Sequence, residues 1–173
     1  MCKSCECYIF FLYFCYNVIG GYMKSIYYYN TIIGELGIVS DEHYIYEIIF
    51  GKRDYVVYET KLMKECYKQL EEYFDGNRKT FDLPLFLEGT EFQKRVWQVL
   101  LKIPYGKTVS YKDIAIFLGN KNMTRAVGNA NNKNKIAIVI PCHRVIGSNG
   151  KLVGYAGGLD RKCKLLELEK KHG

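Results

Sequence analysis

The sequence predicts an α+β protein: a small N-terminal antiparallel sheet with a helix, then a mainly helical C-terminal domain with a winged-helix-like helix-turn-helix. Three observations support this. Runs rich in β-branched and aromatic residues cluster before residue 51, and helical periodicity follows residues 60 and 90. Two short helical stretches then flank a glycine turn. The 173 residues are 49% apolar and 25% charged, as in ordinary globular proteins.

The N-terminal strands are expected at 26–29, 36–39 and 44–50, separated by turn signals at Asn30, Gly34 and Ser40. A helix should follow, because apolar residues recur there at spacings of three and four and Asp75-Gly76 closes the pattern. Its apolar face contains Leu62, Cys66, Leu70 and Tyr73. The stretch 80–89 carries Pro84 and a change of composition, so we expect domains at 23–89 and 90–173.

The C-terminal half begins with a helix in which Thr90 and Gln93 have capping-box spacing. Its expected apolar face contains Phe92, Val96, Val99, Leu100 and Ile103. Ser110 can cap a short helix through Leu118, and a second should span about 123–132 after the turn at 119–120. Two short helices around a tight turn indicate a DNA-binding helix-turn-helix, although other helical hairpins share the pattern.

Two further elements are expected near the C-terminus. The apolar run 136–140, which ends at Pro141, predicts a buried strand. Asp160 is predicted to cap a last helix with Cys163 and Leu166 on its inner face and Glu169 near its end.

Residues 1–22 differ from the rest of the chain and are interpreted as an N-terminal extension of unclear role. Its apolar core resembles a signal peptide in length, so secretion or membrane association is an alternative. However, only Lys3 supplies positive charge, Glu6 opposes it, and no small-residue cleavage site follows. Seven irregularly spaced cysteines favour a reducing, cytoplasmic compartment. Cys2, Cys5 and Cys7 lack a second ligand pair, so no metal site is expected. The sequence contains no membrane-spanning run.

Charge is divided unevenly between the halves. Residues 1–89 contain 9 Lys and Arg against 13 Asp and Glu, whereas residues 90–173 contain 16 against 5. The net charges of −4 and +11 suggest that the C-terminal half meets a polyanion such as nucleic acid. A merely basic soluble surface explains the charge equally well.

Cys142 follows the apolar run and Pro141 and precedes His143 and Arg144. A free thiol is mostly protonated at neutral pH, and positive charge or a nearby base increases its thiolate fraction. Neighbours in extended chain point to opposite faces, so a bridging water could be needed between Cys142 and His143. Glu169 and the other acids are candidates to orient the histidine. The alternative is a buried structural cysteine beside a core histidine.

Pro141-Cys142-His143-Arg144-Val145 resembles the active-site signature of the O6-alkylguanine-DNA alkyltransferases, also called methylated-DNA–protein-cysteine methyltransferases. Further segments match the family in order: Phe92-Gln93 with Val96-Trp97, Ile103-Pro104-Tyr105-Gly106-Lys107-Thr108-Val109-Ser110-Tyr111, Arg125-Ala126-Val127-Gly128 and Tyr155-Ala156-Gly157-Gly158. The resemblance is strong over 90–173 and looser over 24–89.

The resemblance implies that Cys142 accepts an alkyl group from O6 of guanine, once per molecule and without metal or cofactor. His143 would act as base through a water, oriented by Glu169, and Asn134 would support the active-site turn. Tyr111 would donate a hydrogen bond or a proton to the guanine ring as it leaves. Arg125 would enter double-stranded DNA from the minor groove, beside Ala126, and fill the space of the flipped base. Val145, Tyr155, Ala156 and Gly157 would line the base pocket.

The family pattern is not matched everywhere. Ala156 stands where some relatives have serine, and Lys135 and Ala137 stand where some have proline. The metal ligands found in some relatives' N-terminal domains have no clear match. We expect a monomer. Two rival functions stay open: a non-catalytic helix-turn-helix module that binds DNA damage, and a cysteine hydrolase that uses Cys142 and His143.

Overall fold

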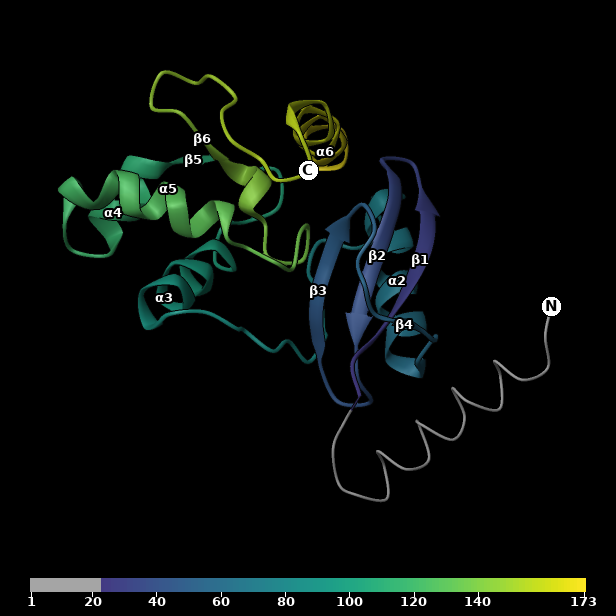
Figure 1. The fold of residues 1–173 in the computed structure, drawn as a ribbon. Helices are drawn as coiled ribbons and strands as arrows, with labels where there is room; N and C mark the ends of the chain where they lie inside the picture. The colour runs from purple at the N-terminus through teal and green to yellow at the C-terminus, as the bar shows by residue number, and fades with distance from the viewer. Residues whose placement is uncertain (1–22) are drawn as a thin grey trace, which may run out of the picture.

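The computed structural model describes residues 23–173 (Figure 1). The predicted extension, with Cys2, Cys5 and Cys7, lies outside the described residues. Within 23–173 the element order agrees with the predicted α+β class, with strands first and helices after them. No helix in this range is long and apolar enough to cross a membrane.

The N-terminal half is a four-stranded sheet with one helix against it. Strands β1 (Ser25–Thr31), β2 (Gly34–Ser40) and β3 (Ile45–Phe50) pair antiparallel at the expected positions. The short strand β4 (Val56–Val57) adds a parallel pair beside β1, so the sheet is mixed rather than purely antiparallel, in the order β3-β2-β1-β4. Helix α2 (Lys61–Phe74) covers one face, and the chain leaves it through the C-cap Asp75 and Gly76, whose φ of 79° suits glycine.

Two helices of the C-terminal half begin at the predicted caps. Thr90 forms a capping box with Gln93 at the start of α3 (Glu91–Leu100), and Ser110 forms one with Asp113 at the start of α4 (Tyr111–Phe117). A 3₁₀ turn, η1 (Lys121–Met123), leads into α5 (Thr124–Asn132), which lies beside α4 as the second helix of the helix-turn-helix.

The prediction of a strand at 136–140 is wrong. Ile136 makes a single bridge to Ile48 of β3, after which the chain turns, and Ile138 adopts a positive φ of 72°. Asn134 explains the turn: its Oδ1 accepts from the Ile136 amide at 3.0 Å and its Nδ2 donates to the Ile140 carbonyl at 2.9 Å. The run is apolar because it is buried at the junction of the two halves.

The last helix also differs from expectation. Helix α6 (Leu159–His172) begins after Gly158, and Asp160 lies in its first turn rather than at the cap. An acid there still faces the positive end of the helix dipole. The buried face consists of Lys162, Leu165 and Glu169, one position away from the predicted Cys163 and Leu166.

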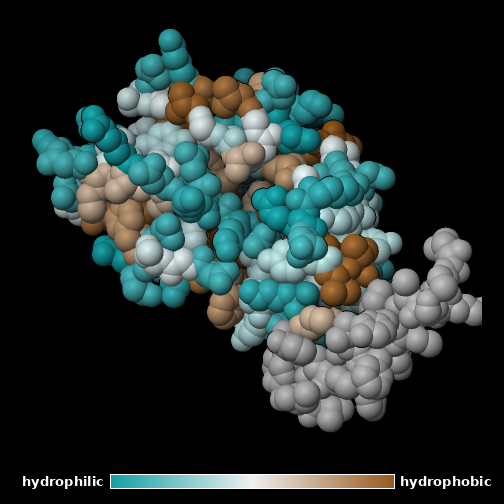
Figure 2. All heavy atoms as spheres, viewed as in Figure 1, coloured by the Kyte–Doolittle hydropathy of each residue, from teal (hydrophilic) through white to brown (hydrophobic). Residues whose placement is uncertain are grey.

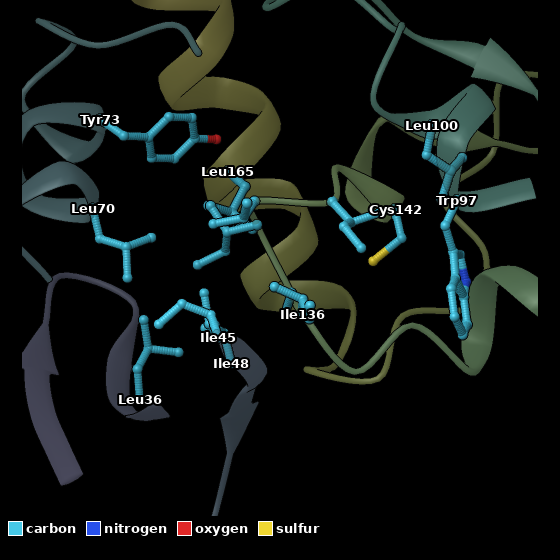
Figure 3. Close-up of a cluster of buried hydrophobic side chains, with 14 of the residues drawn as sticks. Leu36, Ile45, Ile48, Leu70, Tyr73, Trp97, Leu100, Ile136, Cys142 and Leu165 are labelled. Atoms are coloured by element: carbon cyan, nitrogen blue, oxygen red, sulfur yellow. The ribbon is translucent and has the colours of Figure 1, made fainter. Parts of the chain in front are cut away.

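The largest hydrophobic cluster contains side chains from both halves. Figure 3 shows Leu36, Ile45 and Ile48 of the sheet near Leu70 and Tyr73 of α2, with Ile136, Leu165 and Cys142 beside them. Helix α6 lies between the sheet and the helix-turn-helix in Figure 1. Hydrophilic side chains dominate the face shown in Figure 2, with smaller apolar patches between them. Cys142 is itself a member of this shared core and lies between Ile136 and Trp97 in Figure 3.

Candidate active site

Cys142 begins a short 3₁₀ turn, η2 (Cys142–Arg144), directly after Pro141, and only 4% of it is exposed. Its Sγ accepts a hydrogen bond from Asn134 Nδ2 at 3.1 Å. The same amide group therefore closes the preceding turn and contacts the sulfur. Because Asn134 is itself buried, this arrangement fixes the direction in which the thiol points.

Burial raises the pKa of the Cys142 thiol to about 11, although the hydrogen bond from Asn134 and the charge of Lys162 act in the opposite direction. The thiol is therefore protonated at neutral pH in the free protein. A reaction at this sulfur needs a base to remove the proton.

His143 is fully buried, and its Nε2 lies 2.8 Å from Glu169 Oε1. Since an ionised carboxylate only accepts hydrogen bonds, Nε2 carries the hydrogen and Nδ1 carries the lone pair. Nδ1 is buried without a hydrogen-bond partner among the described protein atoms. Burial lowers the pKa of His143 against the opposing effect of Glu169, so the ring is neutral and Nδ1 can accept a proton.

Glu169 accepts hydrogen bonds from several segments of the chain. Arg144 Nε bonds both carboxylate oxygens, at 3.0 and 2.9 Å, and the Gly106 amide donates to Oε2 at 3.0 Å. The Tyr73 hydroxyl donates to Oε1 at 2.7 Å. Burial alone would raise the pKa of Glu169, but the bonds and charges of His143 and Arg144 outweigh it and lower the pKa to about 2. Glu169 is thus a permanent anion behind the histidine.

Lys162 is fully buried and connects two parts of the site. Its Nζ donates to the carbonyls of Val145 at 2.6 Å, Val153 at 2.7 Å and Gly154 at 3.3 Å. Burial lowers the pKa of this amine to about 8. The three bonds hold the loop that contains Val153 and Gly154 against the segment that follows Cys142.

Tyr111 and Tyr155 both lie close enough to Cys142 for its charge to act on their hydroxyls. The pairing of β5 (Val109–Ser110) with β6 (Val145–Ile146) places Tyr111 beside the chain after the cysteine. Its hydroxyl donates to the Val153 carbonyl at 3.2 Å, and burial raises its pKa. Burial also raises the pKa of Tyr155, whose hydroxyl has no hydrogen-bond partner among the described protein atoms.

Of the other residues predicted to line the base pocket or to contact DNA, some are buried and some are exposed. Val145 and Gly157 are buried, and a side chain at Gly157 would collide with the ring of Phe50. Ala156 is exposed next to them. Arg125 and Ala126 are exposed on the first turn of α5, outside the buried group around Cys142.

Sequence reasoning missed Tyr73, Arg144 and Lys162 as partners of the site. Lys162 had a detectable signal, because it lies seven residues before Glu169 and so shares its helix face. Arg144 belongs to the cysteine signature. Tyr73 was recognised only as part of an apolar helix face, and no local spacing links it to Glu169. Within residues 23–173 no group of three or more His, Cys, Asp and Glu side chains is arranged to hold a metal ion.

Two family models match the chain. Residues 26–87 match the 6-O-methylguanine DNA methyltransferase, ribonuclease-like domain, and residues 91–171 match the DNA binding domain of the same family. The methylated-DNA–protein-cysteine methyltransferase of Methanosarcina acetivorans is 49% identical over 148 residues, which cover 82% of this chain and 95% of the relative. The chain belongs to the 6-O-methylguanine DNA methyltransferase family. The resemblance stated from sequence is thereby confirmed.

Further members of the methyltransferase family are similar along most of their length. The constitutive enzyme of Bacillus subtilis is 45% identical over 152 residues, covering 82% of this chain and 92% of the relative. The crystal structure of Mycobacterium tuberculosis O6-methylguanine methyltransferase superposes with a TM-score of 0.80 at 41% identity, covering 87% of this chain and 95% of that one. A structure of the M. tuberculosis protein in complex with DNA gives 0.79 at 43% identity, covering 84% and 92%. These matches confirm the predicted fold class.

Proposed function

We propose that Cys142 is the acceptor through which this methylated-DNA–protein-cysteine methyltransferase performs direct-reversal DNA repair. An alkyl group on O6 of guanine moves to Sγ and stays there. One observation supports this above all: the buried Sγ, held by Asn134, is followed in the same 3₁₀ turn by a neutral histidine whose Nδ1 is unpartnered and whose Nε2 is bonded to Glu169.

The bonding changes balance with the side chains of the site and one bridging water. His143 Nδ1 takes the thiol proton through a water, and Glu169 stabilises the imidazolium that results. The thiolate attacks the alkyl carbon, so the S–C bond forms while the C–O6 bond breaks. Tyr111, whose phenol burial keeps protonated, donates a hydrogen bond or proton to the leaving guanine. The thioether product resists hydrolysis, so each molecule reacts once, and the proposal invokes no cofactor.

Double-stranded DNA that contains O6-alkylguanine is the proposed substrate. The damaged base must leave the stack, at a cost of a few kcal/mol. Arg125, exposed on α5, would enter through the minor groove beside Ala126 and occupy the vacated space. Val145, Tyr155, Ala156 and Gly157 would contact the extruded base, and the net charge of +11 over 90–173 would attract phosphates. We propose that the protein acts as a monomer in the cytoplasm.

The deciding experiment incubates the protein with a duplex that carries one O6-methylguanine and measures the masses of its cysteine peptides. We expect the Cys142 peptide to gain one CH₂, while the Cys66 and Cys163 peptides of the same digest stay unmodified. Cys142→Ser should leave the lesion intact. An unmodified Cys142 peptide with retained lesion binding would instead favour a damage-binding module. No modification and no DNA binding would leave the cysteine hydrolase.

A further inference from the structure

Tyr73 brings the sheet half of the protein into contact with the proposed proton relay. It lies on α2, is fully buried, and its hydroxyl is 2.7 Å from Glu169 Oε1, 96 residues further along the chain. The same hydroxyl lies 3.4 Å from His143 Nε2. Within residues 23–173, the other groups that hydrogen-bond Glu169 all follow residue 90. Figure 3 shows the Tyr73 hydroxyl directed from α2 towards the C-terminal half.

Tyr73 and His143 share one carboxylate oxygen. Oε1 accepts from the phenol at 2.7 Å and from the imidazole at 2.8 Å. Each donor withdraws charge from that oxygen, so the phenol makes it a weaker acceptor for the imidazole. Loss of the phenol would therefore strengthen the interaction of Glu169 with the imidazolium and make His143 more basic.

Neighbouring aromatic rings pack against Tyr73 and hold its hydroxyl against Glu169. Phe81 lies at a centroid distance of 5.4 Å and Tyr105 at 5.7 Å, the latter nearly perpendicular at 79°. Burial, together with the charge of Glu169, raises the pKa of Tyr73 far above its ordinary value. The hydroxyl therefore stays protonated at neutral pH and donates its hydrogen bond to Glu169.

We propose that Tyr73 is a positioning residue for alkyl transfer: its hydroxyl orients Glu169 and the His143 ring and reduces the basicity of that ring. The proposal rests on the function proposed for Cys142. It makes the N-terminal domain part of the chemistry, acting through Glu169 rather than on the DNA. Arg144, Tyr105, Lys162 and Cys142 are the other charged or titratable groups that act on this pair.

The test compares two matched variants, Tyr73→Phe and Tyr29→Phe. Tyr29 is also buried in the N-terminal half, and its hydroxyl donates to Glu59 at 2.8 Å. Each change removes one Tyr–Glu hydrogen bond and leaves the ring, so both should cost similar stability. The rate of methyl transfer from an O6-methylguanine duplex is measured against pH for both variants and the wild type.

We expect Tyr73→Phe to shift the acid limb of the rate profile to higher pH by about half a pH unit or more. At a given pH on that limb, the rate should therefore fall about threefold. The sign follows because the base must be neutral to work, and a more basic His143 stays protonated to higher pH. Tyr29→Phe should leave the limb unchanged. A second variant, with 3-fluorotyrosine at position 73, has a stronger hydrogen-bond donor and should shift the acid limb to lower pH.

Each outcome has one meaning. If wild type leaves Cys142 unmethylated, the proposed function fails. If wild type reacts and the two Phe variants have the same acid limb, with no downward shift from fluorotyrosine, Tyr73 only packs and the positioning role is overturned. Opposite shifts from the Phe and fluorotyrosine variants support it, even where the Phe variant is less stable.

Discussion

Arg144 and Glu169 form a buried ion pair in which the guanidinium Nε contacts both carboxylate oxygens, at 3.0 and 2.9 Å. Arg144 also donates through Nη2 to Oε1 at 2.8 Å and through Nη1 to the Ile103 carbonyl at 2.7 Å. The pair joins the turn that holds Cys142 to the last helix. It follows that Glu169 supports the fold and the site at once.

Glu169→Gln should therefore destabilise the protein by about 3–5 kcal/mol, since it leaves Arg144 buried without a counter-charge. The control is Glu88→Gln, which breaks an exposed bond to Lys135 at 2.8 Å and should cost about 1 kcal/mol or less. Urea unfolding at pH 7 measures both. Equal losses would show that the buried pair contributes no more than a surface pair.

The same carboxylate makes stability depend on acid pH. Its pKa in the folded protein, about 2, lies below the ordinary value of 4.5. A depressed pKa means that the stabilisation is fully present above about 4.5 and is lost as the pH falls towards 2. Wild type should lose stability across this window, and Glu169→Gln should lose less. Parallel curves would contradict the assignment.

Asn134→Asp should slow transfer to Cys142 by about tenfold or more. Aspartate keeps the acceptor for the Ile136 amide but replaces the donor to Sγ with a negative charge, which raises the pKa of the thiol further. The exposed turn residue Asn149, whose Oδ1 accepts from the Lys151 amide, provides the control Asn149→Asp. Single-turnover rates across pH check the prediction. A rate equal to that of the control would mean that the Asn134 donor has no influence on the sulfur.

Lys162→Met should release the loop that its amine holds. The carbonyls of Val145, Val153 and Gly154 lose a shared donor, and we expect a cost of about 2 kcal/mol or more. Hydrogen exchange should accelerate in residues 147–158. Lys164→Met, an exposed position on the same helix, should change neither stability nor exchange. Unchanged exchange in 147–158 after Lys162→Met would contradict this.

Arg125→Ala should slow transfer from an O6-methylguanine duplex by about tenfold or more, equivalent to about 1.4 kcal/mol, while reaction with the free O6-methylguanine base is unchanged. The physical reason is that only a duplex requires the gap of an extruded base to be filled. Lys133→Ala removes another exposed charge at the end of α5 and should have a small effect on both substrates. Equal slowing of duplex and free base would count against the role of Arg125.

The sequence predicted most elements because their signals are local. Runs rich in β-branched and aromatic residues indicated β1 to β3, and the capping residues Thr90 and Ser110 indicated where α3 and α4 begin. The signature around Cys142 likewise lies in adjacent residues. Such signals depend on neighbours within one turn or one strand, so they can be read without knowing the fold.

The errors occurred where burial, rather than spacing, decides. Residues 136–140 are apolar because both halves enclose them, which a buried strand and a buried turn explain equally well from sequence alone. The inner face of α6 was misplaced by one residue because Lys162 and Glu169 are charged, and charged residues are expected at the surface. They are buried because each has partners contributed by other segments.

The positions of most strands and helices, the capping boxes of α3 and α4 and the identity of the candidate nucleophile were determined by the sequence itself. The tertiary structure alone decided that Tyr73 meets Glu169 across 96 residues and that Lys162 binds three carbonyls of the site. The reason is physical: local conformation depends on adjacent residues, whereas a contact between distant residues depends on how complete elements pack around a common core.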